Sequence, residues 1–224
     1  MKIDAFEGRA EAYTIARPGY PKEALEYIRN LAPKNAVFAD IGAGTGKFTA
    51  LLAEFDYKIF AIEPSKDMLK QLKISMEKYK NVEIIKGTAE NTTLDDNCVD
   101  IITNAQALNR LDLNLFKKEC KRIGKTSPII ISLYNHERNG NLSRYNKSTG
   151  EFYNNPTIVN FDNPIYFTKD KWLMYYYSME GVPKESDKEY EEWNNKLIEK
   201  FDRESVNGIL FHDLITNIFW EKIG

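Results

Sequence analysis

The sequence predicts an α/β fold in which helices cover both faces of a mostly parallel sheet. Helical and strand patterns alternate through the first 135 of the 224 residues, which is typical of βαβ units. A run of glycines follows the first buried strand. Hydrophobic residues make up 42% of the chain and charged residues 29%, which indicates a globular protein rather than a disordered or membrane-spanning one.

The expected elements follow from the spacing of apolar residues. Apolar positions three or four apart indicate helices, whereas short continuous apolar runs indicate buried strands. Pro21 suits the first turn of a helix, and Pro33 ends it. The expected strands are 36–41, 58–62, 82–85, 99–103 and 129–133, and further helices are expected from about Lys47, from about Ser65 and over 115–123.

The pattern changes after residue 135. Residues 136–156, rich in Asn, Ser and Gly, indicate a loop with at most a short helix. Extended chain is expected near 158–167, followed by an aromatic helix over 172–177 and a longer helix from 190 to 201. The stretch 210–220 predicts an antiparallel strand at the edge of the sheet.

Charge and cysteine content restrict the partners. The net charge is -2, and the densest basic cluster, 117–122, is interrupted by an acid, so we expect no nucleic-acid partner. The longest aliphatic run, 129–131, is too short to cross a bilayer, and the N-terminal segment lacks the apolar part of a secretory signal. Cys98 and Cys120 match no metal or redox spacing. We therefore expect a cytoplasmic protein without a membrane partner or a metal.

The glycine run Asp40-Ile41-Gly42-Ala43-Gly44-Thr45-Gly46 indicates a binding loop. Glycine has no Cβ and tolerates positive φ, so the main chain can turn sharply and approach a ligand. A helix beginning near Lys47 would direct free N–H groups toward polar ligand atoms. The alternative is a tight turn without a ligand, although a single glycine would serve that purpose.

Two familiar phosphate-binding loops do not fit these residues. The dinucleotide pattern G-x-G-x-x-G requires glycine where Lys47 stands. The P-loop pattern requires glycine at position 41 and Ser or Thr at position 48, which hold Ile41 and Phe48.

The run resembles motif I of the class I S-adenosylmethionine-dependent methyltransferases, D/E-x-G-x-G-x-G. The resemblance implies a Rossmann-like three-layer sandwich, with a mostly parallel seven-stranded sheet and an antiparallel C-terminal strand, that binds S-adenosyl-L-methionine. Asp40 would meet the methionine end of the cofactor directly or through water. Glu63 stands at the tip of the next strand, 23 positions later, where a carboxylate can bind the ribose hydroxyls.

Further segments extend this resemblance. Thr88-Ala89-Glu90 would border the adenine, and Asn104-Ala105-Gln106 would line the methyl-donor and acceptor sites. The segment from Tyr13 to Pro21 resembles the Y-x-x-x-R-P-x-Y-P opening of type 11 methyltransferases, including trans-aconitate methyltransferase-like proteins. That opening folds over the cofactor, so Tyr13 and Arg17 would meet its carboxylate or wall the acceptor pocket. The predicted cofactor-binding residues are Tyr13, Arg17, Asp40, Gly42, Ala43, Gly44, Thr45, Gly46, Glu63, Pro64, Met68, Thr88, Ala89, Glu90, Asn104, Ala105 and Gln106.

The sequence departs from these relatives in two places. They often carry a His-Trp pair where this chain has Asn109-Arg110, and Arg110 could instead bind a carboxylate through its planar guanidinium. Residues 136–156 are shorter and more polar than the usual insertion over the acceptor. The lid would then be reduced, or rebuilt from residues 172–177.

These observations predict a single domain over residues 1–224, with an N-terminal arm and helix (1–34), a cofactor-binding core (35–135) and a C-terminal part with acceptor-site elements (136–224). The expected activity is in-line methyl transfer to a small-molecule acceptor by a monomer or homodimer. No catalytic residue is assigned; His136, His212, Tyr13 and Tyr134 are candidates for a general base. The alternatives are a non-catalytic cofactor-binding protein, an RNA methyltransferase and, third, a nicotinamide-dependent oxidoreductase.

Overall fold

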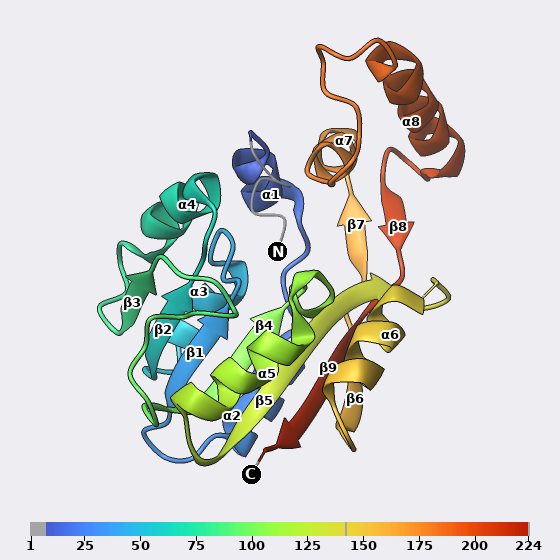
Figure 1. Cartoon of the computed structure of the whole chain (residues 1–224). Helices are drawn as coiled ribbons and strands as arrows, with labels where there is room; N and C mark the ends of the chain where they lie inside the picture. The colour runs from blue at the N-terminus through green and yellow to red at the C-terminus, as the bar shows by residue number, and fades with distance from the viewer. Residues whose placement is uncertain (1–7, 142, 224) are drawn as a thin grey trace.

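A seven-stranded sheet with the order β3-β2-β1-β4-β5-β9-β6 runs through the middle of the molecule (Figure 1). The computed structural model describes residues 8–141 and 143–223. Neighbouring strands are parallel except that β9 is antiparallel to both β5 and β6, which confirms the predicted fold class. The strands are β1 (Val37–Ile41), β2 (Lys58–Ile62), β3 (Val82–Ile85), β4 (Val99–Ala105), β5 (Gly124–Glu137), β6 (Thr157–Asp162) and β9 (Leu214–Lys222).

Helices cover both faces of this sheet and bury its apolar strands. Phe38 of β1 packs in a cluster with α2 and α3, whereas the next residue, Ala39, packs in the cluster with α5 and α6. Strands buried on both faces read as continuous apolar runs, which is why they could be predicted. The covering helices are α2 (Lys22–Leu31), α3 (Lys47–Ala53) and α4 (Lys66–Met76) on one face, and α5 (Leu113–Ile123) and α6 (Ser143–Phe152) on the other.

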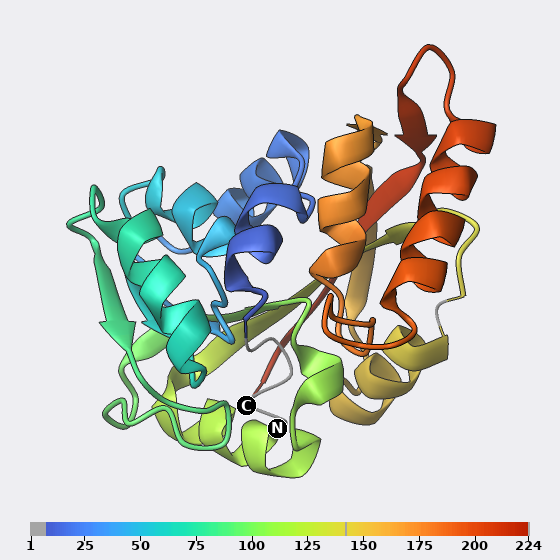
Figure 2. The same ribbon diagram turned by 90° about the horizontal axis from the view of Figure 1, so that it is seen from above.

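A smaller unit stands above the carboxyl ends of the parallel strands (Figure 1). It has its own apolar cluster, formed by Phe167, Trp172, Leu197, Phe201 and Leu210. Figure 2 shows the N-terminal helix α1 between this unit and the core, and α1 contacts both α7 and α4. The elements concerned are α1 (Ala10–Ala16), the two-stranded sheet of β7 (Ile165–Phe167) and β8 (Leu210–His212), α7 (Lys169–Tyr177) and α8 (Tyr190–Glu204).

Two expectations for the second half of the chain need correction. Residues 136–156, expected to form a loop with at most a short helix, contain the ten-residue helix α6. This helix is longer than expected because its apolar positions find partners: Phe152 stacks on Phe116 at 5.2 Å between ring centroids. The stretch 210–220 is not one edge strand. It divides at Asp213 into β8 and β9, and β9 lies inside the sheet while β6 forms the edge.

None of the helices in the described part of the chain combines the length and the apolar character needed to cross a membrane.

Candidate active site

The glycine loop joins β1 to α3, and Gly44 and Gly46 differ in what surrounds them. Gly42, Gly44 and Gly46 all have positive φ (70°, 59° and 88°). A Cβ on Gly46 would lie 2.8 Å from Leu72 Cδ1, so Gly46 allows α3 to pack against α4. A Cβ on Gly44 would meet nothing closer than 3.9 Å. The main chain at Gly44 is therefore open to a ligand.

Glu63 follows β2 and connects this loop to the next helix. Its Oε2 accepts a hydrogen bond from Gly44 N at 2.8 Å, and its Oε1 accepts one from Ser65 N at 2.9 Å. Burial raises the pKa of Glu63, and the two backbone hydrogen bonds oppose that rise. The carboxylate thus fixes the loop and still lines the cavity beside it.

Asp40 lies beneath the loop rather than in the cavity. Its two carboxylate oxygens accept hydrogen bonds from Thr49 Oγ1 at 2.6 Å and from Thr103 Oγ1 at 3.0 Å. Burial raises the pKa of Asp40 to about 6. Asp40 therefore supports the loop from below and does not line the cavity.

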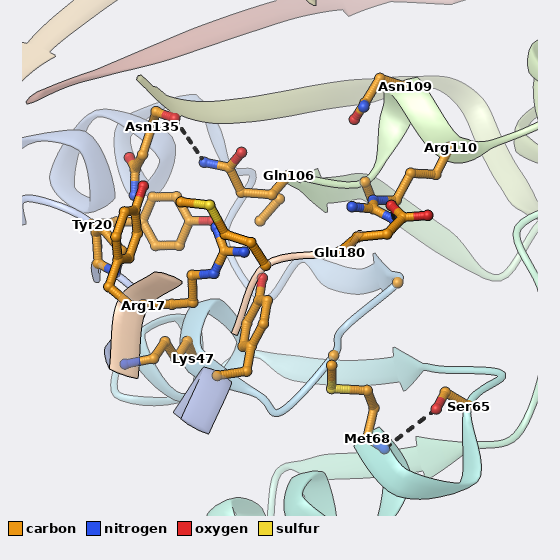
Figure 3. A pocket seen from close by; sticks show the side chains of 18 of the residues that line it. Arg17, Tyr20, Lys47, Ser65, Met68, Gln106, Asn109, Arg110, Asn135 and Glu180 are labelled. Atoms are coloured by element: carbon orange, nitrogen blue, oxygen red, sulfur yellow. Dashed lines mark hydrogen bonds and ion pairs between the residues drawn. The ribbon is translucent and has the colours of Figure 1, made fainter. Parts of the chain in front are cut away.

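A cavity of about 670 Å³ opens where β1, β2 and β4 end. Parallel α/β sheets bind ligands at this edge, beside the point where the strand order reverses. The cavity lies between the core, α1 and the segment after α7 (Figure 3). Eight of the predicted residues line it: Tyr13, Arg17, Gly42, Gly44, Glu63, Met68, Ala105 and Gln106.

The other predicted residues do not line this cavity. Besides Asp40, they are Ala43, Thr45, Gly46, Pro64, Thr88, Ala89, Glu90 and Asn104. Ala89 is part of the core, and Glu90 Oε1 accepts a hydrogen bond from Asp112 N at 3.1 Å. Asn104 is buried with no hydrogen-bond partner for its Oδ1 among the described residues.

The N-terminal arm forms one wall of the cavity and is tied to α7. Arg17 Nε donates to Ser178 Oγ at 2.8 Å, and its guanidinium lies 5.1 Å from the Tyr13 ring centroid and 5.3 Å from that of Tyr175. Arg17 and Tyr175 line the same cavity, and the predicted role of Arg17 at the cofactor carboxylate or in the acceptor wall stays a prediction.

Arg110 pairs with an internal carboxylate. Its Nη1 lies 2.7 Å from Glu180 Oε2, and the pair joins the end of the short helix η1 (Leu108–Arg110) to the segment after α7. Both residues line the cavity (Figure 3).

Neither histidine lines the cavity. His136 Nδ1 is bonded to the Glu137 carbonyl, and His212 packs against Trp172 in the smaller unit, where burial lowers its pKa. Burial raises the pKa of the cavity residues Tyr20 and Tyr175, which disfavours their phenolates as bases near neutral pH.

Several cavity residues were not predicted from the sequence. Lys47 directly follows the glycine loop, so its position in the sequence could have indicated that it lines the cavity. Asn135, Tyr145 and Tyr175 come from β5, α6 and α7, and only the packing of these elements brings them to the cavity. In the part of the chain that the structure describes, no three acidic, histidine or cysteine side chains gather where they could hold a metal ion.

Comparison with known proteins identifies the class of this domain. Residues 39–131 match the family model described as "Methyltransferase domain". Over these residues the predicted methyltransferase domain is confirmed, and the cofactor of the predicted class is S-adenosyl-L-methionine.

Two relatives give the extent of the sequence similarity. An uncharacterized methyltransferase of Mycobacterium tuberculosis is 37% identical over 108 residues, which are 48% of this chain and 42% of the relative. An uncharacterized methyltransferase-like protein of Schizosaccharomyces pombe is 30% identical over 128 residues, or 56% of this chain and 49% of the relative. The matched region therefore spans less than half the length of each relative.

Solved structures share the fold at low sequence identity. A protein assigned as a type II methyltransferase from Anaeromyxobacter dehalogenans matches with a TM-score of 0.68 and 17% identity over 92% of this chain and 97% of its own. Geranyl diphosphate C-methyltransferase from Streptomyces coelicolor, solved with S-adenosyl-L-homocysteine, matches with a TM-score of 0.51 and 14% identity over 89% of this chain and 76% of its own.

Proposed function

We propose that this chain is an S-adenosylmethionine-dependent methyltransferase that transfers a methyl group in line to a small-molecule acceptor. The observation that carries the proposal is a single cavity lined both by Gly44 and Glu63 of the core and by Tyr145 and Tyr175 of the C-terminal part. The proposal includes the division into an arm (1–34), a cofactor-binding core (35–135) and acceptor-site elements (136–224). A cytoplasmic location and a monomeric or homodimeric state stay predictions.

The residues present fit the cofactor. Gly44 leaves room for a ligand against the main chain, and Glu63 presents a buried carboxylate suited to ribose hydroxyls. Asp40 holds the loop from below through Thr49 and Thr103. When bound, S-adenosylmethionine supplies a methyl group on a sulfonium sulfur, which leaves as a neutral thioether.

The remaining cavity residues position an acceptor and exclude water. Tyr13, Arg17 and Tyr175 close the cavity from the arm and α7, which favours a small molecule over a nucleic-acid chain. Orientation of two reactants can contribute roughly 7–11 kcal/mol to a rate enhancement. No histidine lines the cavity among the described residues, so the site favours an acceptor that needs no strong base.

Titration calorimetry with S-adenosyl-L-homocysteine tests the cofactor site. The wild-type protein should bind, and Gly44→Val should lose binding because its side chain fills the open space and is strained at φ +59°. Gly208→Val is the matched control, since Gly208 also has positive φ with nothing within 4 Å but does not line the cavity.

Failure of folded wild-type protein to bind at millimolar ligand would overturn the proposal. Binding without any methylated product across a broad panel of small-molecule acceptors would instead favour a non-catalytic cofactor-binding protein.

A further inference from the structure

Lys47 brings a positive charge to the cavity that no described residue neutralises. Its partly buried side chain lines the cavity at the start of α3, directly after Gly46. Neither a hydrogen bond nor an ion pair joins its ammonium to any residue in 8–141 or 143–223. Burial lowers the pKa of Lys47, and the nearby charge that adds to this effect is another lysine, Lys171. A bound anion would therefore stabilise this partly desolvated ammonium.

The other two cations that line the cavity already have partners in the protein. Arg110 is paired with Glu180 at 2.7 Å. Arg17 donates to the hydroxyl and the carbonyl of Ser178 at 2.8 and 3.2 Å. Both arginines therefore bind the segment that follows α7, whereas Lys47 extends from the glycine loop itself.

The position of Lys47 relative to the adenosine side of the site indicates which anion it meets. Glu63, Ser65 and Met68 border the cavity where β2 leads into α4. In Figure 3, Ser65 and Met68 lie at one end of the view and Lys47 lies toward the opposite end. A cofactor with its ribose at Glu63 and its amino-acid part along the glycine loop would direct its carboxylate toward Lys47.

Building on the proposed function, we infer that Lys47 binds the carboxylate of the methionine part of S-adenosylmethionine. The three N–H donors of the ammonium suit a carboxylate, and the pair would supply the counter-charge that the described residues do not provide. Arg17 would then hold the arm against the end of α7 and line the acceptor side of the cavity.

The test compares two ligands that differ only in the carboxylate. Lys47→Met keeps the aliphatic part of the side chain and removes the charge. We expect it to weaken binding of S-adenosylmethionine in titration calorimetry by about 10- to 100-fold, the range for a lost charge-assisted hydrogen bond. Binding of decarboxylated S-adenosylmethionine should change by less than about twofold, because that ligand has no carboxylate to lose. Lys171→Met, a nearby exposed lysine outside the cavity lining, should leave both affinities close to wild type.

Thermal unfolding without ligand establishes that each variant is folded, and Lys47→Gln serves as a second variant if Lys47→Met is not. An equal effect on both ligands, or no effect on either, overturns the assignment. A loss specific to the carboxylate-bearing ligand in Arg17→Gln, but not in the Lys47 variants, also overturns it and gives the role to Arg17. If the wild-type protein binds neither ligand, the proposed function itself fails.

Discussion

Asp40 supports the glycine loop, but its buried carboxylate lowers the free energy of unfolding at neutral pH. Its carboxyl group is fully buried beneath the glycine loop, and its hydrogen-bond partners among the described residues are two threonine hydroxyls. Burial raises its pKa from 3.8 to about 6. Between these pH values the folded state holds more protons than the unfolded state, so the free energy of unfolding falls as pH rises from about 4 to 6.

Asp40→Asn should therefore stabilise the protein at neutral pH. The amide cannot ionise, and it retains the size and the hydrogen-bonding ability of the acid. We expect the free energy of unfolding to rise by up to about 2–3 kcal/mol at pH 7.5 and to change little at pH 4. Denaturant unfolding at the two pH values measures this difference. A stabilisation that is the same at both would show that ionisation of Asp40 is not its cause.

At the scale of whole elements, α1 and α7 are held together by arginines of the arm. Arg9, which precedes α1, donates to the carbonyls of Tyr177 at 2.8 Å and Val182 at 2.7 Å. These carbonyls lie at the end of α7 and in the segment after it, which contributes Met179 and Glu180 to the cavity. The arm thus fixes one wall of the cavity.

Arg9→Ala should loosen that wall without unfolding the core. Removing two charge-assisted hydrogen bonds should lower the free energy of local opening around residues 175–182 by about 2 kcal/mol. Hydrogen exchange followed by mass spectrometry should report faster exchange there and unchanged exchange in β1 and β4. Arg203→Ala is a suitable control, because the ion pair of Arg203 within the described chain is an exposed one with its neighbour Glu204. Faster exchange throughout the sheet would contradict the prediction.

Some elements of the fold and site could be predicted from the sequence, and others could not. The glycine loop and Glu63 could be predicted, because each follows a strand of one βαβ unit and the parallel pairing of β1 with β2 brings both to the same edge of the sheet. The sequence predicts at most a short helix where α6 lies, because polar residues fill its outward positions and few apolar residues, such as Phe152, mark its buried face. Tyr145 and Tyr175 could not be assigned, because their arrival at the cavity depends on packing between distant elements.

At the scale of the whole molecule, the smaller unit is inserted between two neighbouring strands, the end of β6 and the start of β9. Asn163 N donates to the carbonyl of Leu214 at 2.8 Å, and Asp162 is the register partner of Ile215. The residues between them build a separate apolar cluster around Trp172. A unit with adjacent ends and its own core can be absent without breaking the sheet, because β6 and β9 already form an antiparallel pair.

Replacing residues 163–214 with Asn-Gly should therefore leave a folded core. This dipeptide favours the two-residue turn that joins antiparallel strands, so β6 and β9 would become a hairpin. We expect cooperative denaturant unfolding and measurable binding of S-adenosyl-L-homocysteine, since Gly44 and Glu63 remain. The affinity should fall, because Arg9 and Arg17 lose their partners on α7 and the arm no longer closes the cavity. Methyl transfer should be lost with Tyr175 and Glu180. An unfolded product would mean that the smaller unit is required for the sheet to form, and undiminished methyl transfer would place the acceptor wholly within the core.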